Sequence, residues 1–314
     1  MEKISLIVPC YNEEEVLPLF YQEVTRVAGL MGEYDFEFLF VDDGSRDNTI
    51  KVVRELAGKD ERVKYVSFSR NFGKEAAMYA GFTYASGDYV AVMDADLQDP
   101  PALLPEMMRA IKEEGYDSVA TRRVTRKGEP VIRSFFARCF YRLMHRISKT
   151  EIVDGARDYR FMTRQFVDSL LSLSEYNRFS KGLYGWVGYR TKWIEFENVE
   201  RAAGETKWSF WNLLLYSIEG IVAFSAAPLA IAAVTGILCC LLAFVFILFI
   251  VVRTLIFGDP VAGWPSMICV ILLTGGLQLL SIGILGEYLA KTYLEVKNRP
   301  IFICKESNIR ENDR

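Results

Sequence analysis

The sequence predicts an α/β domain built on a largely parallel sheet, followed by two membrane-spanning helices. In the first 121 residues, short apolar and β-branched runs alternate with helix-like segments, which is the pattern of βαβ units. Later in the chain, no charged residue lies between Glu219 and Arg253 or between Asp259 and Glu287. Each of these stretches exceeds the roughly 20 residues that a helix needs to cross a bilayer.

The expected strands are short and separated by helix-like segments. They cover residues 4–8, 36–41, 63–68, 89–93 and 118–121, and a later strand is expected over 189–196. A basic amphipathic helix is expected over 130–147 and a further helix over 162–173. In parallel sheets, ligands bind beyond the carboxyl ends of the strands, so the polar residues that directly follow these strands are candidate site residues.

Polar clusters follow four of the expected strands. They lie at residues 9–13, 42–45, 69–71 and 94–96. Because the carboxyl ends of parallel strands share one edge of a sheet, we expect these four loops to converge on a common site.

The strongest candidate metal ligands are Asp94 and Asp96. Two carboxylates two residues apart, directly after a buried strand, can present hard oxygen ligands to an Mg²⁺ or Mn²⁺ ion that bridges phosphate groups. As a bare pattern such a pair more often marks a solvated loop, but Gln98 adds an oxygen ligand and the turn at 99–101 stiffens the loop. Zinc is not expected, because His145 is the only histidine and no cysteine lies near the aspartates.

The sequence argues against several other classes of protein. No GxGxxG follows a strand and no GxxxxGK[ST] occurs, so the main signatures of dinucleotide and P-loop binding are missing. The net charge of −3 gives no basic footprint for nucleic acid. The six cysteines show no CxxC or disulfide-scaffold spacing, and we expect free thiols.

Three motifs together resemble those of the inverting glycosyltransferase family 2. They are residues 7–13, 41–49 and 94–98, and they follow that family's order and spacing. Within the family the chain is most similar to polyprenyl-phosphate glycosyltransferases, namely the dolichyl-phosphate mannose synthases and especially the bactoprenol glucosyltransferase type with two C-terminal spans. The resemblance covers almost the whole chain. It implies a GT-A (Rossmann-like) domain that transfers a hexose, with UDP-glucose favoured as the donor, to undecaprenyl phosphate.

The resemblance also implies which residues hold the nucleotide-sugar and the metal. The nucleotide-sugar pocket is expected to include Pro9, Tyr11, Glu13, Asp42, Asp43, Lys74, Asp94 and Ala95, and the metal ligands are expected to be Asp94, Asp96 and Gln98. The metal would stabilise the charge of the leaving nucleoside diphosphate as a Lewis acid. For Lys74, a surface lysine at the start of a helix is the alternative interpretation.

The resemblance implies four basic residues at the acceptor phosphate, and a phosphate held by a protein needs such cationic partners. They are Arg122 after the fifth strand, Arg133 in the basic helix, and Arg201 and Lys207 in the loop before the first span. The alternative for Arg122 and Arg133 is a solvated basic face. For Arg201 and Lys207 it is a charged linker on the cytoplasmic side of a span.

The expected catalytic residues are Asp158, Asp96 and Arg122. Residues 155–161 match the segment in which bactoprenol-type enzymes place a catalytic aspartate, so Asp158 is the candidate base or acceptor-orienting group. A phosphate monoester is already anionic at pH 7, because its second pKa lies near ~6, so a strong base is not required. The alternative for Asp158 is a structural ion pair with Arg157 or Arg160.

The expected domains are a catalytic domain over 1–205, an interfacial helix over 206–225, two spans at about 226–253 and 264–288 within 226–292, and a cytoplasmic tail over 293–314. Tryptophans in the interfacial segment favour the headgroup layer of a bilayer. Lys and Arg flank the outer ends of the spans but are absent from 258–263, which predicts a multi-pass protein of the cell membrane with the catalytic domain and both termini in the cytoplasm. The relatives suggest a homotetramer, although neither span contains GxxxG.

Two alternatives for the function stay open. One is a membrane-bound transferase that acts on a glycolipid or saccharide hydroxyl, which would need Asp158 as a true base. The other is a non-catalytic membrane scaffold that binds a nucleotide-sugar. A processive polymerase is not favoured, because the sequence lacks QxxRW and its spans carry no central charge.

Overall fold

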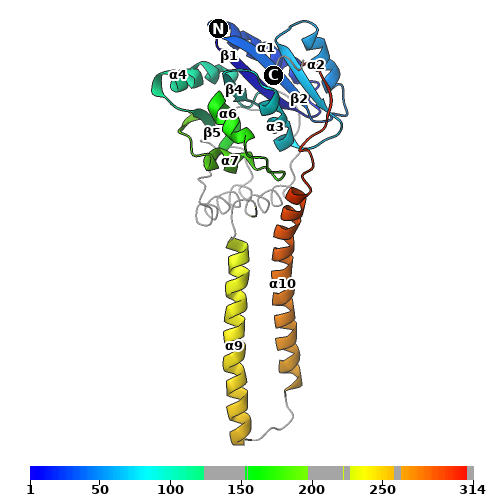
Figure 1. Cartoon of the computed structure of the whole chain (residues 1–314), viewed down its shortest axis with the longest axis vertical. Helices are drawn as coiled ribbons and strands as arrows, with labels where there is room; N and C mark the ends of the chain where they lie inside the picture. The colour runs from blue at the N-terminus through cyan, green and yellow to red at the C-terminus, as the bar shows by residue number, and fades with distance from the viewer. Residues whose placement is uncertain (124–152, 154, 197–221, 223–226, 258–262, 310–314) are drawn as a thin grey trace.

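In the computed structural model, a mixed α/β domain stands at one end of two long helices (Figure 1). The structure describes residues 1–123, 153, 155–196, 222, 227–257 and 263–309. The basic helix expected over 130–147 and nearly all of the interfacial helix expected over 206–225 lie outside these residues.

Strands and helices alternate through the first part of the chain, as the hydrophobic pattern predicts. The elements are β1 (Lys3–Cys10), α1 (Leu17–Leu30), β2 (Asp35–Asp42), α2 (Thr49–Ala57), β3 (Val63–Phe68), α3 (Lys74–Tyr84), β4 (Tyr89–Val92), η1 (Pro101–Leu103), α4 (Leu104–Glu114) and β5 (Ser118–Arg123). They are followed by β6 (Ala156–Thr163), α6 (Arg164–Leu171), α7 (Ser180–Trp186), β7 (Thr191–Phe196), α9 (Ala227–Phe257), α10 (Trp264–Val296) and β8 (Cys304–Ser307).

The strands of the described residues form one sheet, in the order β7-β5-β6-β4-β1-β2-β3-β8. Strand β1 is parallel to β2 and β4, β2 is parallel to β3, and β5 is parallel to β7. Strand β6 runs antiparallel between β4 and β5, so its first residues reach the edge at which β4 and β5 end. The predicted α/β class with a largely parallel sheet is therefore confirmed, and one antiparallel strand delivers its amino end to the expected ligand edge.

Two hydrophobic clusters fill the two faces of the sheet. On one face, residues such as Phe20 of α1 and Phe161 of β6 pack with side chains of α4. On the other face, Ile7 of β1 and Phe166 of α6 pack with side chains of α3 and α7. Burying each such side chain contributes about 1.5–3 kcal/mol. Helices α3 and α7 thus cover the same face, which matters for the site.

The C-terminal residues return to the α/β domain. Strand β8 pairs antiparallel with β3, and the ring of Phe302 stacks on that of Phe68 with their centroids 5.0 Å apart. The side chain of Asn308 makes two hydrogen bonds with the backbone of β3. It accepts from the Tyr65 N–H at 2.7 Å and donates to the Val63 carbonyl at 3.0 Å. Residues 304–309, expected as part of a polar tail, therefore close the outer edge of the sheet.

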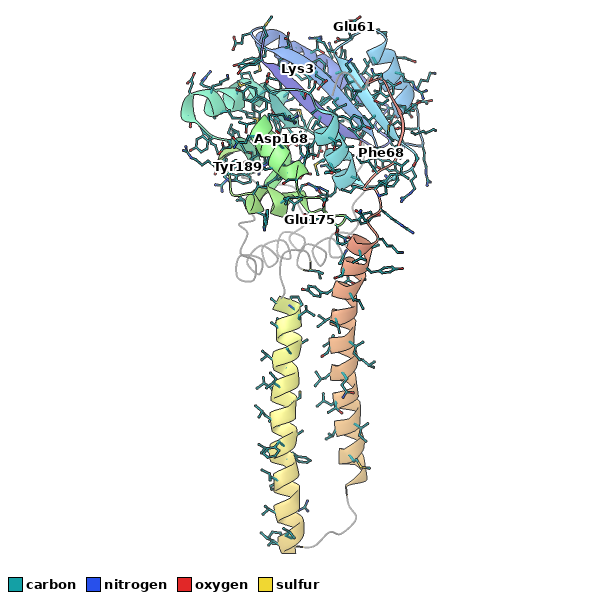
Figure 2. All side chains as sticks on the ribbon, viewed as in Figure 1. Lys3, Glu61, Phe68, Asp168, Glu175 and Tyr189 are labelled. Carbon is teal, nitrogen blue, oxygen red and sulfur yellow. The ribbon has the colours of Figure 1, made fainter. Side chains whose placement is uncertain are left out.

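Helices α9 and α10 are 31 and 33 residues long. Both are long and apolar enough, by length and composition, to cross a membrane, over Ala227–Phe246 and Leu273–Val296. Their large apolar side chains point outward along their length (Figure 2), and Leu242 and Leu279 are 69% and 72% exposed. Surfaces of this size are unfavourable in water and need an apolar environment or a partner.

Candidate active site

The loops that follow β1 and β2 are joined by hydrogen bonds. The backbone N–H of Asn12 donates to the Ser45 hydroxyl at 3.0 Å, and the Asn12 side-chain oxygen accepts from the Arg46 N–H at 2.8 Å. The Glu13 N–H donates to the Thr49 hydroxyl at 2.8 Å. Asn12 has a left-handed φ of 54°, a conformation that asparagine tolerates better than most residues. Two of the sequence motifs therefore form one rigid unit at the carboxyl edge of the sheet.

Asp42 and Asp43 are buried and occupied with hydrogen bonds inside the domain. Asp42 accepts from the Ser67 hydroxyl at 2.7 Å and from the Ser45 N–H at 3.1 Å. Asp43 accepts from the N–H groups of Phe72 at 2.6 Å and Gly73 at 2.9 Å, and its burial raises its pKa to about 6. Both carboxylates hold the loops, and Asp43 fixes the turn that begins α3.

Gly44 makes a close contact possible between the β2 and β3 loops. Its φ is +65°, and a Cβ at this position would lie 2.4 Å from the carbonyl carbon of Arg70. Any other residue would therefore push the two loops apart.

Lys74, the first residue of α3, joins two aspartates from distant parts of the chain. Its Nζ lies 2.6 Å from Oδ1 of Asp94, which follows β4, and 2.5 Å from Oδ2 of Asp158 in β6. The side chain of Lys74 is 37% exposed, and those of Asp94 and Asp158 are 25% and 19% exposed, so the cluster is open to a ligand. Lys74 is thus paired with two aspartates and does not project freely into solvent.

The charges in this cluster determine its protonation. Burial would lower the pKa of Lys74, but the charges of Asp158 and Asp94 raise it above its usual value. Burial would raise the pKa of Asp158, but the charges of Lys74 and Lys181 bring it well below its usual range. At neutral pH Lys74 is therefore an ammonium and Asp158 a carboxylate that is a weak base.

Asp99 and Arg157 anchor the loop after β4 to β6. Arg157 Nε donates to Oδ1 of Asp99 at 2.9 Å, and the Asp99 side chain is fully buried. Burial raises the pKa of Asp99 to about 6. The alternative pairing of Asp158 with Arg157 or Arg160 is wrong, because Asp158 pairs with Lys74 and Arg157 pairs with Asp99. Sequence reasoning treated Asp99 only as part of a stiff turn.

The aspartates expected to bind metal lie in a tight turn. Asp96 Oδ1 accepts from the Gln98 N–H at 3.1 Å, and Leu97 between them has a left-handed φ of 56°. The described residues contain no group of three or more acidic, histidine or cysteine side chains placed to hold a metal. Magnesium commonly takes only one or two carboxylates and completes its shell with substrate phosphates and water. Asp94 and Asp96 fit a cation that binds in this way, together with a nucleotide.

Arg122 lies at the same edge of the sheet but is paired with another residue. Its Nε donates to Oε1 of Glu195 in β7 at 2.9 Å, and the two side chains are 42% and 47% exposed. Arg133, Arg201 and Lys207, the other basic residues expected at an acceptor phosphate, lie outside the described residues.

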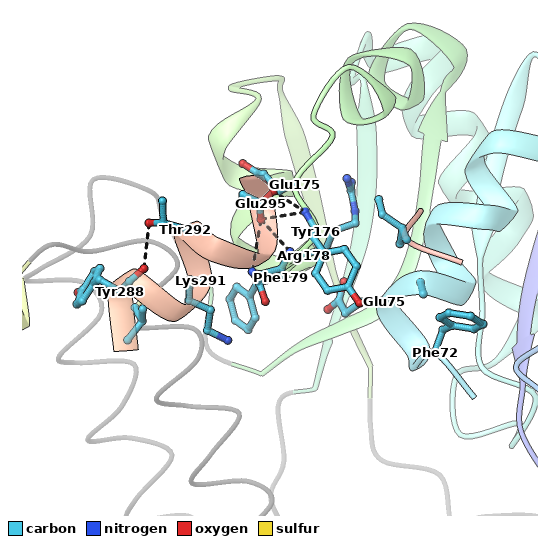
Figure 3. A pocket seen from close by; sticks show the side chains of 14 residues that line it. Phe72, Glu75, Glu175, Tyr176, Arg178, Phe179, Tyr288, Lys291, Thr292 and Glu295 are labelled. Carbon is cyan, nitrogen blue, oxygen red and sulfur yellow. Dashed lines mark hydrogen bonds between the residues drawn. The ribbon is translucent and has the colours of Figure 1, made fainter. Parts of the chain in front are cut away.

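A chain of contacts that sequence reasoning missed connects α10 to this region. Glu295, near the end of α10, accepts from the backbone N–H groups of Tyr176 at 3.0 Å and Asn177 at 3.1 Å (Figure 3). A few residues later, the Ser180 N–H and hydroxyl donate to Glu75, the residue after Lys74. Burial raises the pKa of Glu75 to about 7. A cavity of about 470 Å³ lies between α3, residues 175–179 and α10.

Comparisons with known proteins agree on a family. The model for glycosyl transferase family 2 matches residues 5–171. The putative glycosyltransferase CsbB of Bacillus subtilis (strain 168) is 44% identical over 310 residues, covering 99% of this chain and 93% of the relative. The SfII prophage-derived bactoprenol glucosyl transferase of Shigella flexneri is 41% identical over 306 residues, covering 98% of each chain.

Among solved structures, the chain is similar to glucosyl-3-phosphoglycerate synthase from Mycobacterium tuberculosis in complex with Mn²⁺ and uridine-diphosphate-glucose. The TM-score is 0.45 at 20% identity, covering 70% of this chain and 77% of that chain. The family assignment rests on the family model and on the two full-length relatives. The resemblance carried by the three loop motifs is thereby confirmed, and this chain belongs to glycosyltransferase family 2 and is a glycosyltransferase.

Proposed function

We propose that the protein transfers a hexose, with glucose from UDP-glucose favoured, to the phosphate of undecaprenyl phosphate, with inversion at the anomeric carbon. The acceptor class is supported by the relative named as a bactoprenol glucosyl transferase, which matches over 98% of this chain. The single structural observation that carries the proposal is the ion pair of Lys74 with Asp158 at the carboxyl edge of the sheet.

The Lys74–Asp158 pair favours a phosphate acceptor over a hydroxyl acceptor. A hydroxyl group must lose a proton when it attacks, and a carboxylate whose pKa lies well below its usual range is a poor base for that step. A phosphate monoester is already ionised at pH 7 and attacks without a base. Asp158 then acts by holding Lys74 in place and orienting the acceptor.

Lys74 is the cation that this chain itself supplies to the donor. Its Nζ lies within hydrogen-bond distance of three carboxylate oxygens, Oδ1 and Oδ2 of Asp94 and Oδ2 of Asp158. Its positive charge can attract a diphosphate oxygen of the nucleotide-sugar, and one N–H can turn from Asp94 to that oxygen. A hydrogen-bond donor whose position is fixed before the reaction, in a partly enclosed site, stabilises the negative charge that develops on the leaving group.

Asp94 and Asp96, with Gln98 as a further candidate ligand, would hold Mg²⁺ or Mn²⁺ together with the nucleotide. When bound, the cation supplies Lewis-acid stabilisation of the leaving diphosphate. Asp94 would then contact both Lys74 and the cation, and this shared contact would fix the position of the cation relative to Lys74. The expected roles of Pro9, Tyr11 and Glu13 in the nucleotide pocket remain proposals, as do those of Asp42, Asp43 and Ala95, which order or line the same loops.

We further propose that α9 and α10 span the cell membrane, with the α/β domain and both termini in the cytoplasm. The length and apolar surface of both helices support this arrangement, as do the basic residues that flank their outer ends. The prenyl tail can then stay in the bilayer while only its phosphate reaches the protein. The same proposal includes the expected domain boundaries and assembly as a homotetramer. It also includes binding of the acceptor phosphate by Arg122, Arg133, Arg201 and Lys207.

A transfer assay tests the proposed reaction. Detergent-purified protein is incubated with undecaprenyl phosphate, Mg²⁺ or Mn²⁺ and a panel of radiolabelled nucleotide-sugars, and the label is followed into the organic phase. We expect transfer from one donor, requiring a divalent cation and lost in Asp96→Asn. If nucleotide binds but no donor labels the lipid, the proposal is wrong and a different acceptor must be sought.

A further inference from the structure

A second cavity, of about 280 Å³, lies between α7 and residues of β6 and β7. Its lining is basic and aromatic and includes Arg157, Arg160, Lys181, Tyr184, Thr191 and Trp193. Tyr189, which also lines it, is labelled in Figure 2. The cavity adjoins the Lys74 cluster, because Asp158 and Arg160 are two residues apart in β6 and so lie on the same face of the sheet.

Arg160 is a buried cation that makes no ion pair within the described residues. The residue is 3% exposed, and Nη1 donates to two neutral oxygens, those of Ser118 at 2.9 Å and Thr191 at 3.4 Å. Its Nε is buried without a partner, and no carboxylate of the described residues forms an ion pair with the guanidinium. Burial lowers its pKa to about 10, so it still carries its charge at pH 7. The guanidinium packs over the rings of Tyr184 and Trp193, at 4.3 and 5.4 Å from their centroids, and the charge of Asp158 acts on it without a direct ion pair. A buried cation with no direct ion pair leaves room for an anionic ligand in the cavity.

Two residues of α7 add donors to the same cavity. Tyr184 is 4% exposed, and its buried hydroxyl has no partner of good hydrogen-bond geometry among the described residues. Lys181 lies one helical turn earlier, on the same face of α7, and makes no ion pair within the described residues. Its charge nevertheless reaches Asp158, so the lysine stands where the cavity meets the Lys74 cluster. Arg157 contributes less, because Asp99 already balances its charge.

We propose that this cavity binds a phosphate monoester through Arg160, Lys181 and the Tyr184 hydroxyl. The three residues offer two positive charges and several N–H and O–H donors, which match the charge and the oxygens of such a group. This inference rests on the proposed function for the source of the phosphate, which we assign to the acceptor lipid; the three residues add to the basic residues proposed above for that phosphate and do not replace them. Lys181 would then screen the acceptor phosphate from the negative charge of Asp158.

Binding of the acceptor without a donor tests the site. The probe is radiolabelled undecaprenyl phosphate, titrated onto the full-length protein in detergent micelles, with inorganic phosphate as the competitor. We expect Lys181→Gln and Tyr184→Phe to weaken binding by roughly 10- to 100-fold, the range for a lost hydrogen bond to a charged group. The matched control is Lys192→Gln, because Lys192 pairs with Glu114 at the surface, and it should bind like the wild type. The affinity for the nucleotide-sugar should stay unchanged in all three variants.

The outcomes separate the site from the reaction. If neither variant changes the affinity for the lipid or for inorganic phosphate, the cavity is not a phosphate site. If inorganic phosphate binds through Lys181 but the lipid does not compete, the ligand is a soluble phosphate and the assignment to the acceptor is wrong. If the lipid binds through Lys181 but the wild type transfers no sugar, the proposed function fails and the phosphate site stands.

Discussion

Replacing Lys74 by methionine removes the ammonium that joins Asp94 and Asp158 while keeping a side chain of similar length. Two charge-assisted hydrogen bonds are lost, with N–O distances of 2.5 and 2.6 Å. Each such bond contributes about 1.5–3 kcal/mol when buried. Lys74 is 37% exposed, so solvent screens the pair and we expect a loss of roughly 2 kcal/mol of folding stability.

The effect of Lys74→Met on catalysis should exceed its effect on folding. Removing one fixed donor from a developing anion typically lowers kcat by about 10²- to 10³-fold. The assay measures kcat and KM for transfer of labelled sugar to undecaprenyl phosphate, alongside thermal unfolding of each variant. Lys74→Arg, which keeps the charge, should recover part of the rate, and Lys192→Met at the surface should behave like the wild type. A Lys74→Met enzyme with a kcat within about threefold of the wild type would refute the role assigned to Lys74. Each tenfold loss in kcat corresponds to ~1.4 kcal/mol of transition-state stabilisation, and a threefold loss is well below one such step.

Three further predictions follow from the loops and helices around the site. Gly44→Ala should lower stability by about 2 kcal/mol or more and raise the KM for the donor, because a Cβ meets the Arg70 backbone at 2.4 Å and φ is +65°. The control is Gly29→Ala in α1, where nothing lies within 4 Å; it should not lower stability, because alanine favours a helix more than glycine does, and it should leave the kinetics unchanged. Burial raises the pKa of Glu75 to about 7, so the ionisation of Glu75 lowers the stability of the fold as the pH rises from about 4.5 to 7. Glu75→Gln should therefore flatten the pH dependence of the unfolding temperature. An unchanged profile would contradict the raised pKa. Glu295→Ala removes the acceptor of backbone N–H groups at 3.0–3.1 Å, so limited proteolysis should cut residues 175–179 faster than in the wild type, and equal cleavage rates would show that α10 does not hold this segment.

Much of the fold could be predicted because its signals are local. The strands β1 to β5 are short apolar runs that alternate with helical segments, and the structure has each of them. Strand β6 was missed because charged residues interrupt its apolar pattern, and only the structure shows that Arg160 is buried within it. Strand β8 was missed because four polar residues at the end of a chain carry no strand signal without the β3 edge beside them.

The site could be predicted in part for the same reason. The loops after β1, β2 and β4 carry recognisable motifs, and the rule for carboxyl ends of parallel strands brings them together. The pairing of Lys74 with Asp158 joins residues 84 positions apart, and it depends on β6 entering the sheet antiparallel. The buried pair of Asp99 and Arg157 depends on the same strand. Sequence periodicity reports which face a residue occupies, but it does not report which side chain of another element it meets.

The nature of the bond formed tests the central claim most directly, namely that the acceptor atom is a phosphate oxygen that needs no base. The lipid product is purified from a preparative reaction and examined by phosphorus-31 NMR before and after mild acid. We predict that the phosphate monoester resonance of undecaprenyl phosphate is replaced by that of a phosphodiester, and that mild acid releases the sugar. A labelled product in which the phosphate remains a monoester and the sugar survives mild acid would contradict the account, because it would place the sugar on a hydroxyl group.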